Sequence, residues 1–520
     1  MVNSRPEVSL SVGMQGQPQA QPHEPAAASD PFKILVVADL SGRASRGECA
    51  PDTIAQRRVT RIDRDDFEDV LAAMTPTLHV PFGASGASLE MTFKELDDFH
   101  PDALYQRVDV FDRLRSLRDR LNNPKTAAAA IEELTSARQQ PEAKPEQPEQ
   151  PDADSTDASG IDASSLLESA LQATESAPAS SRSSSIVDQL VREFVTPHSI
   201  PRPDARVADL VADVERAMSG EMRALLTSAP FQQLEASWRS LYLLVRRLDT
   251  DSKLQIHVLD VSAEELRAGF ASADDPLRTG LAKHLIDRAG DTAGGVPYAV
   301  VVTDFSAAAS IEDVALVEQL AAVSARAGSV TLCAASSQLV GCDSFSVGPD
   351  TDDWQSSIDA AVQQQWSTFR ARPEAAAMGM IMPRVLTRQP YGAKSSPVSC
   401  FPFEEERGHE SGDYRHDDLP WGNAAFLVAL LLGETFQRDG WRMQLLASDE
   451  VSGMPLYVRT VAGQSEAVPC AEVELSSGGG ERIGERGIMS MYSVLGTDSV
   501  RLGVLRSVSS VSVGLSGRWG

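Results

Sequence analysis

The sequence predicts a mixed α/β fold, with mixed sheets flanked by helices. Residues 298–302, YAVVV, form a continuous apolar run, which is typical of a strand buried on both faces. A helical pattern follows over residues 311–327 and ends at Gly328, and residues 330–335 predict a further strand. Strand, helix and strand at this spacing indicate parallel pairing with right-handed crossovers.

Near the start of the chain, Val8, Leu10 and Val12 alternate with polar residues. This period is typical of a half-buried strand, although a disordered tail with chance alternation fits the pattern equally well. Because a lone strand is not stable, a strand here must pair with a distant segment, in this molecule or in another.

Residues 32–140 predict one small unit. Residues 32–38, FKILVVA, predict a buried strand, residues 61–74 contain a helix, and residues 89–93 alternate as another strand. Pro101 opens a helix that ends near Asn122. The apolar face of this last helix consists of Leu104, Val108, Phe111, Leu114, Leu117 and Leu121.

Residues 141–200 form a linker rich in proline and serine, which cannot bury enough apolar surface to order itself. Within it, Leu166, Leu167 and Leu171 would cluster on one face of a short helix. So short a helix is marginal alone. Two interpretations stay open: residual helicity in a tether, or a docking peptide that folds into the groove of a partner.

Residues 204–247 predict two amphipathic helices broken near Pro230, with Thr227 or Ser228 as the cap of the second. A strand over residues 254–258 follows. The next helix begins with a capping box of Ser262 and Glu265. Beyond Gly422 we expect a β-rich region, with short strands at residues 471–475, 488–494 and 500–505.

Composition excludes several classes of function. The net charge of −27 argues against nucleic acid and against anionic membrane surfaces, because both attract basic proteins. The five cysteines are widely spaced, which indicates a reducing cytosol. We expect no signal peptide, and the longest apolar run, residues 424–432, is too short for membrane insertion.

No known catalytic or phosphate-binding motif is present, so we expect a protein that is not an enzyme and has no cofactor or metal. The glycines of residues 478–487 predict a hairpin or loop. His409 and His416 lie in an acidic segment with Asp413, Asp417 and Asp418, for which a solvated loop is the favoured interpretation over a metal site. Asp97 and Asp98, near His100, are expected to cap the helix at Pro101. Asp39 follows the first strand without the rest of a nucleotide site.

The segment FQQLEASWRSL, residues 231–241, resembles the signature of the large subunit of the type VI secretion contractile sheath. Further motifs follow in the family's order: PRVLTRQPYG from Pro383, FPFEEE from Phe401, WGNAAF from Trp421 and AEVELSSGGGERIGERGIMSMY from Ala471. The residues that form the core of these motifs are Phe231, Leu234, Trp238, Pro383, Arg384, Trp421, Gly422 and Asn423.

The first part of the chain resembles the small subunit of the same sheath, through residues 31–43, 57–71 and 93–105. These are ordinarily two chains, and here they are fused. The resemblance implies four regions: an N-terminal arm (1–31), a small-subunit-like domain (32–140), a linker with a docking helix (141–200) and a large-subunit-like domain (201–520).

The resemblance implies a contractile tail-sheath-like fold with terminal linking strands. Such a protomer polymerises with itself in the bacterial cytoplasm, around an Hcp-like inner tube protein on baseplate components, and contracts to propel the tube. Val8, Leu10 and Val12 lie where the family's linking strand lies. Leu166, Leu167 and Leu171 lie where a ClpV-type AAA+ ATPase binds. The alternatives are a soluble adaptor that does not polymerise and, less favoured, a nucleotide-dependent α/β enzyme.

Overall fold

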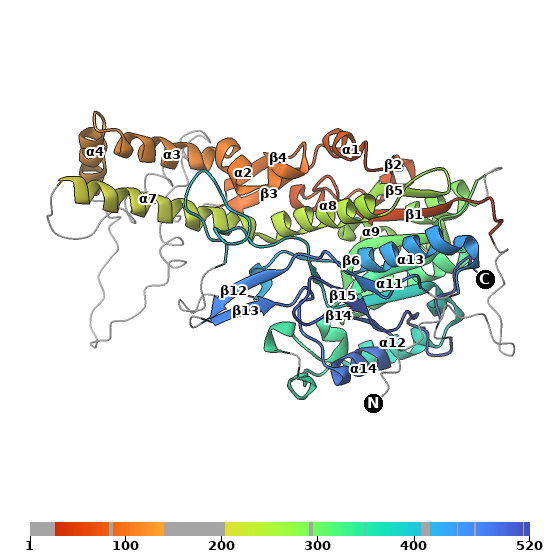
Figure 1. Cartoon of the computed structure of the whole chain (residues 1–520). Coiled ribbons are helices and arrows are strands. Elements are labelled where there is room, and N and C mark those ends of the chain that lie inside the picture. The colour runs from red at the N-terminus through yellow and green to blue at the C-terminus, as the bar shows by residue number, and fades with distance from the viewer. Residues whose placement is uncertain are drawn as a thin grey trace, which may run out of the picture.

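The computed structural model describes most of the chain, as a mixed α/β body with a protruding helical arm (Figure 1). The fold class predicted from sequence is confirmed. The predicted strand at residues 7–12 and the predicted helix at residues 162–173 lie outside the described residues. The described residues are 26–82, 87–139, 203–290, 295–348, 350–406, 416–444, 446–461, 464–512 and 514–519.

A nine-stranded sheet runs through the body in the order β11-β15-β14-β8-β7-β6-β1-β5-β2. The strands from β5 to β14 in this order pair in parallel, whereas β2, β15 and β11 are antiparallel additions at the two edges. The predicted parallel pairing is therefore confirmed. The strands are β1 (Phe32–Ala38), β2 (Thr60–Ile62), β5 (Leu254–Asp260), β6 (Val300–Ala307), β7 (Val330–Ala335), β8 (Met378–Met382), β11 (Glu450–Val451), β14 (Met489–Ser493) and β15 (Val500–Leu502).

Strand β1 joins the two parts of the chain. It comes from the part of the chain before residue 140, yet it lies between β5 and β6, which come from the part after residue 202. Its seven residues pair with β5, from Phe32 opposite Leu254 to Ala38 opposite Asp260, and its middle residues pair with β6. Every residue of β1 except Lys33 is buried. The two parts therefore complete one sheet together.

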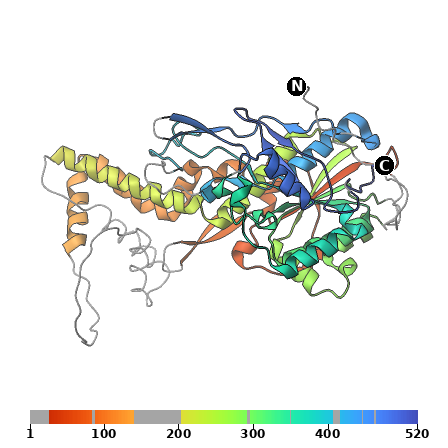
Figure 2. The same ribbon diagram turned by 90° about the horizontal axis from the view of Figure 1, so that it is seen from below.

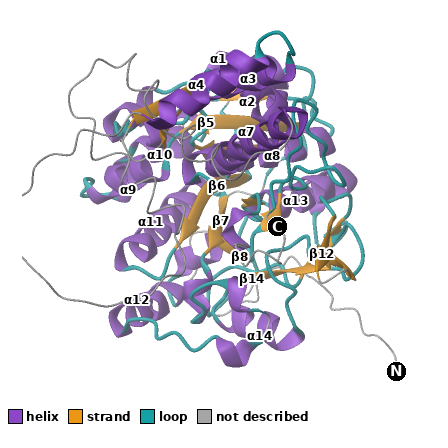
Figure 3. Cartoon of the chain, turned by 90° about the vertical axis from the view of Figure 1, so that its left-hand side faces the viewer, coloured by secondary structure: helices purple, strands orange, loops and turns teal. Residues whose placement is uncertain are grey.

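The two faces of the sheet pack against different helices (Figure 3). Ile34 and Val36 face the core that contains α8 and α13, whereas Leu35 and Val37 face the core that contains α9 and α11, because successive side chains of a strand point to opposite faces. The helices of the body are α1 (Phe67–Met74), α8 (Ala229–Arg247), α9 (Ala263–Ala271), α10 (Gly280–Ala282), α11 (Ile311–Ala327), α12 (Ala360–Arg370), α13 (Ala425–Asp439) and α14 (Ser477–Glu485).

The helical arm extends away from the sheet (Figure 2). Its two long helices, α3 and α7, pack along each other, and the ion pair between Arg118 and Glu215 crosses between them at 2.9 Å. The predicted break near Pro230 is confirmed: α7 ends at Leu226, α8 begins at Ala229, and Pro230 lies in the first turn of α8. Ser228 occupies the N-cap position, but its hydroxyl donates to the Leu225 carbonyl and does not cap α8. The arm and its base comprise β3 (Thr77–Phe82), β4 (Ala87–Thr92), α2 (Pro101–Arg107), α3 (Asp109–Asn122), α4 (Ala127–Gln139) and α7 (Pro203–Leu226).

The single helix predicted from Pro101 to Asn122 is wrong. Val108 is extended, with φ −91° and ψ 119°, and it separates α2 from α3. Its N–H ends α2 on the Leu104 carbonyl, while its own carbonyl accepts the N–H of Phe111 and starts α3. The apolar positions are buried on both helices, so the periodicity predicted burial correctly but could not detect the change of direction.

The β-rich region predicted beyond Gly422 is only partly correct. Strands β14 and β15 form, but residues 471–475 contribute only an isolated bridge between Ala471 and Val385, and α13 is a long helix. The glycine-rich segment is the helix α14 and not a loop. A Cβ at Gly480 would lie 1.5 Å from the Tyr492 hydroxyl, so this glycine permits close packing on β14.

We expect Trp238→Ala to destabilise the whole body by about 3–5 kcal/mol, because the ring is fully buried and its removal leaves a cavity. The Trp238 ring packs edge-on against Phe67 at 5.7 Å, and its Nε1 donates to the Leu40 carbonyl at 2.9 Å. Denaturant unfolding measures the loss. The exposed Arg246→Ala on the same helix is the control. Equal stability of the two variants would contradict the prediction.

Candidate functional site

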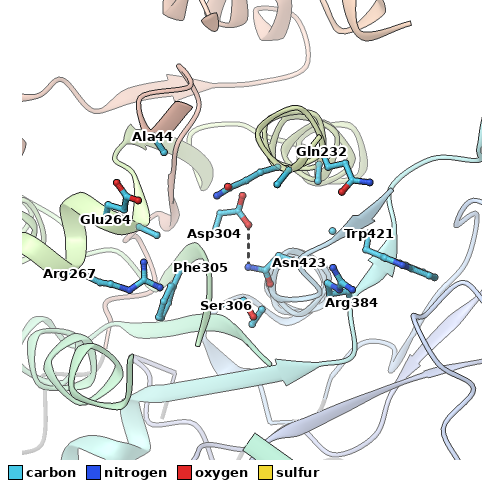
Figure 4. Close-up of a pocket in the computed structure, with 16 residues that line it drawn as sticks. Ala44, Gln232, Glu264, Arg267, Asp304, Phe305, Ser306, Arg384, Trp421 and Asn423 are labelled. Atoms are coloured by element: carbon cyan, nitrogen blue, oxygen red, sulfur yellow. Dashed lines mark hydrogen bonds between the residues drawn. The ribbon is translucent and has the colours of Figure 1, made fainter. Parts of the chain in front are cut away.

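Residues from three of the motifs, at 231–241, 383–392 and 421–426, line a crevice beyond the carboxyl ends of β1, β6 and β7 (Figure 4). The chain passes from β1 to β5 on one side and then to β6 on the other, and such a reversal is where open α/β sheets commonly bind ligands. The crevice has a volume of about 470 Å³. Its polar lining includes Gln232, Gln233, Asp304, Ser306, Arg384 and Asn423.

Asp304 is the carboxylate at the centre of this crevice (Figure 4). Burial raises its pKa, against hydrogen bonds from Ser237 and Asn423 that act to lower it. The Asn423 amide donates to the Asp304 carboxylate at 3.3 Å and to the Thr303 carbonyl at 3.2 Å, and its oxygen accepts the Ala425 N–H at the start of α13. Asp304 and its partners therefore connect α8, β6 and α13.

The remaining motif residues divide between this crevice and the core. Trp421 and Gly422 line the crevice on β10 (Trp421–Gly422), which pairs with β9 (Val385–Leu386). Phe231, Leu234 and Trp238 are buried in the core instead. A Cβ at Gly422 would lie 2.3 Å from the Thr387 side chain, so only glycine fits.

Pro383 follows β8 through a cis peptide bond and leads into Arg384. The Arg384 guanidinium pairs with Glu472 at 2.6 Å and with Asp417 at 2.8 Å. Because these two carboxylates neutralise its charge, Arg384 holds the segments of Glu472 and Asp417 onto its own, and its guanidinium is not available to bind an anionic ligand.

The loop after β1 closes the place where a nucleotide fold would bind phosphate. Asp39 accepts the N–H groups of Arg43 and Ala44, at 2.7 and 2.8 Å. Asp260 accepts those of Leu40 and Ser41, at 2.9 and 3.0 Å. These backbone donors are the kind that cradle phosphate, and here carboxylates of the same chain occupy them.

Glu265 binds the first part of the chain to the second. It is fully buried and accepts hydrogen bonds from the guanidinium groups of Arg43 and Arg57, at 2.6 to 3.1 Å. Burial acts to raise the pKa of this carboxylate, but the two arginines and the N–H groups of Ala50 and Ser262 outweigh it and hold the pKa at about 2. The predicted capping box with Ser262 is confirmed.

A second buried ion network lies beside α8. Glu235 accepts from Arg239 and from Arg388, each at 2.8 Å. Arg388 also donates hydrogen bonds to both carboxylate oxygens of Glu405, at 2.7 and 2.8 Å, and its guanidinium lies over the Tyr391 ring. The segment from Arg388 to Glu405 is thereby fixed onto α8.

The expected capping by Asp97 and Asp98 is wrong for the helix at Pro101. Asp98 closes a capping box with Glu95 on the short turn before it, and His100 caps α2 by accepting the Asp102 N–H at 3.1 Å. His100 performs this role because burial lowers the pKa of its imidazole and keeps it neutral.

The candidate metal ligands are only partly described. His409 and Asp413 lie outside the described residues, while the His416 ring is tilted against the Trp421 ring and lies 3.7 Å from a Glu472 oxygen. Within the described ranges, no three histidine, cysteine or carboxylate side chains are grouped as metal ligands.

The ion networks of Glu265 and Glu235 were not predicted from the sequence. The only signal in the sequence was that each glutamate lies on the buried face of a predicted helix.

We expect Glu265→Gln to destabilise the body by about 3–5 kcal/mol near neutral pH, because two partly buried arginines, Arg43 and Arg57, lose a buried carboxylate partner. A carboxylate whose pKa falls to about 2 on folding stabilises the fold above its unfolded pKa, and this stabilisation is lost as pH falls from about 4.5 towards 2. The difference from the parental chain should therefore shrink in acid. The neighbouring exposed Glu264→Gln is the control. A pH-independent difference in unfolding free energy would contradict this account.

No helix in the described part of the chain combines the length and apolar character needed to cross a bilayer.

Residues 208–511 match the family model described as EvpB/VC_A0108, tail sheath N-terminal domain. Residues 24–147 match the model described as type VI secretion system, VipA, VC_A0107 or Hcp2.

Two curated proteins of Pseudomonas aeruginosa are similar to the two parts. The type VI secretion system sheath protein TssC1 is 28% identical over 299 residues, which cover 56% of this chain and 59% of that protein. The sheath protein TssB1 is 36% identical over 98 residues, which cover 18% of this chain and 55% of that protein. The chain thus spans less than two thirds of the length of either relative. It belongs to the type VI secretion tail sheath family, with a VipA-like segment fused to a VipB-like segment in one polypeptide.

Proposed function

We propose that this chain is the structural protomer of a contractile sheath, which polymerises around an inner tube and contracts to propel it. The observation that carries the proposal is the position of β1. One polypeptide supplies a VipA-like strand to the middle of a VipB-like sheet, so a single chain provides both parts of a sheath protomer body. The resemblance to the two sheath proteins supports the same conclusion.

We propose that residues 7–12 link neighbouring protomers by strand addition. The acceptor we favour is the hairpin of β12 (Tyr457–Val461) and β13 (Gln464–Val468), a separate two-stranded sheet. Residues 464–467 are exposed, and Val458 is 49% exposed. Two strands alone are marginal, so a third strand from a neighbour would add main-chain hydrogen bonds and bury Val458. Strands β14 and β15 already belong to the central sheet.

The proposed protomer is not an enzyme and needs no cofactor. The loop N–H groups after β1 are occupied by Asp39 and Asp260, and the two arginines that line the crevice, Arg267 and Arg384, are paired with carboxylates of the chain. These contacts disfavour the nucleotide-dependent enzyme. A soluble adaptor that kept the fold but does not polymerise is the remaining alternative.

The partners follow from the proposed role. They are further copies of this chain, an Hcp-like inner tube protein, baseplate components and a ClpV-type ATPase, all in the bacterial cytoplasm. We propose the same four regions as in the sequence analysis. The N-terminal arm (1–31) links neighbouring protomers, and the linker (141–200) binds the ATPase. Leu166, Leu167 and Leu171 would form the face that the ATPase binds.

Purified protein should form tubes or ring stacks visible by electron microscopy, alone or with an Hcp-like protein. Deleting residues 1–14 should abolish them without changing the melting temperature of the monomer, whereas an adaptor would be unaffected. A sharper variant replaces Val8, Leu10 and Val12 by Asn, because one face of the linking strand is then polar. The same replacement at Ser9 and Ser11, on the opposite face of the linking strand, is the matched control. A compact monomer at high concentration with its arm intact would overturn the proposal.

Changing Leu166, Leu167 and Leu171 to Ala should leave assembly intact and weaken binding of a purified ClpV-type ATPase at least tenfold, since three apolar anchors are lost. Fluorescence anisotropy with the peptide of residues 160–176 measures this affinity. Glu168→Ala with Gln172→Ala is the control on the polar face. Equal affinity of the leucine variant would remove the docking interpretation.

A further inference from the structure

Residues 514–519 return to the start of β1, at the right-hand end of the sheet in Figure 1. The Ala26 N–H donates to the Arg518 carbonyl at 3.4 Å, and the Ser516 N–H donates to the Ala376 carbonyl at 2.8 Å. This segment therefore connects the entry to β1 with the segment before β8. It lies outside the residues that either family model matches, 24–147 and 208–511.

Arg518 and Trp441 hold the residue at which the chain enters β1. The Arg518 guanidinium pairs with the Asp30 carboxylate at 2.8 Å and lies 5.4 Å from the centre of the Trp441 ring. The Trp441 Nε1 donates to the Asp30 carbonyl at 2.8 Å. With 10% of the Arg518 side chain exposed, this pair is shielded from solvent, so it is stronger than a surface ion pair.

An aromatic cluster covers the first residue of β1. Phe32 is stacked with Phe436 at 4.7 Å and with Trp519 at 6.3 Å, and lies 5.4 Å from Trp441. Trp519 is 5% exposed. A Cβ at Gly517 would lie 2.6 Å from the Trp519 ring, so glycine allows the segment to fold that ring back onto the cluster.

We propose that residues 514–519 are a clamp that makes residues 26–31 and β1 resist extension as one unit when the N-terminal arm is pulled. The source of the pull, a neighbouring protomer, and its direction, towards the β12–β13 hairpin, rest on the proposed function. The arm joins the amino end of β1, and Figure 1 places the β12–β13 hairpin at the other end of the body. A pull between these points runs along β1. The backbone hydrogen bonds of β1 to β5 and β6 run across the strand, so a pull along the strand loads them together. A pull across the strand would instead peel β1 away and break these hydrogen bonds one at a time.

The clamp has a specific mechanical role in this arrangement. Without it, residues 26–31 would extend first, before β1 carries the load. With Asp30 held by Arg518 and Trp441, and Phe32 covered by Trp519, the load enters β1 along its axis.

Optical-tweezers extension of single full-length chains tests the proposal, with handles on peptide tags inserted after Gly16 and at Gly463. The parental chain should show no step before the body unfolds. Arg518→Gln and Trp519→Ala should each add an early, low-force step of up to about 20 Å, the length of six released residues. Arg442→Gln, an exposed arginine beside Trp441, is the matched control and should behave as the parental chain.

Arg518→Gln keeps the aromatic cluster, so it tests the clamp even if Trp519→Ala does not fold. An early step in the parental chain, or no early step in Arg518→Gln, would overturn the proposal. The measurement uses single chains. Failure to form tubes would therefore contradict the proposed function and leave the clamp intact, and an absent early step would do the reverse.

Discussion

The hydrogen-bond ladder that holds β1 between β5 and β6 is the constraint on which the rest of the structure depends. A strand at the centre of a parallel sheet must satisfy donors and acceptors on both sides, and here the neighbours come from a different part of the chain. The helices α8 and α13 on one face and α9 and α11 on the other can pack only once β1 is in place, since Ile34, Leu35, Val36 and Val37 supply both cores.

Buried charges complete this junction. Glu265 with its two arginines joins the loops of the first part to α9, and Glu235 with Arg388 fixes a later segment onto α8. Such pairs cost desolvation and add little net stability over apolar residues, but breaking one is expensive, so they specify which segments meet. The crevice lies where α/β sheets commonly bind ligands, but Arg267 and Arg384 in its lining are already paired with Asp313 and Glu472.

The sheet, its two cores and its ion networks form one unit, as the body of the proposed force-bearing protomer requires. We propose that strand exchange takes place elsewhere, at residues 7–12 and at the β12–β13 hairpin, which is a separate sheet. Residues 514–519 pack on Asp30 and Phe32, between the N-terminal residues and the sheet, and in our proposal this packing determines how load reaches β1.

The sequence by itself determined most of the elements and the family. Period and capping predicted β1, the long helices and the capping box at Ser262, because these depend on neighbours within a few residues. Only the tertiary structure decided that β1 enters the sheet of the second part, that Val108 breaks a helix, and that the glycines before β14 form a helix against Tyr492. The physical reason is that strand order, and the close approach that Gly480 permits, depend on contacts between segments far apart in the chain, which local patterns of polarity do not encode.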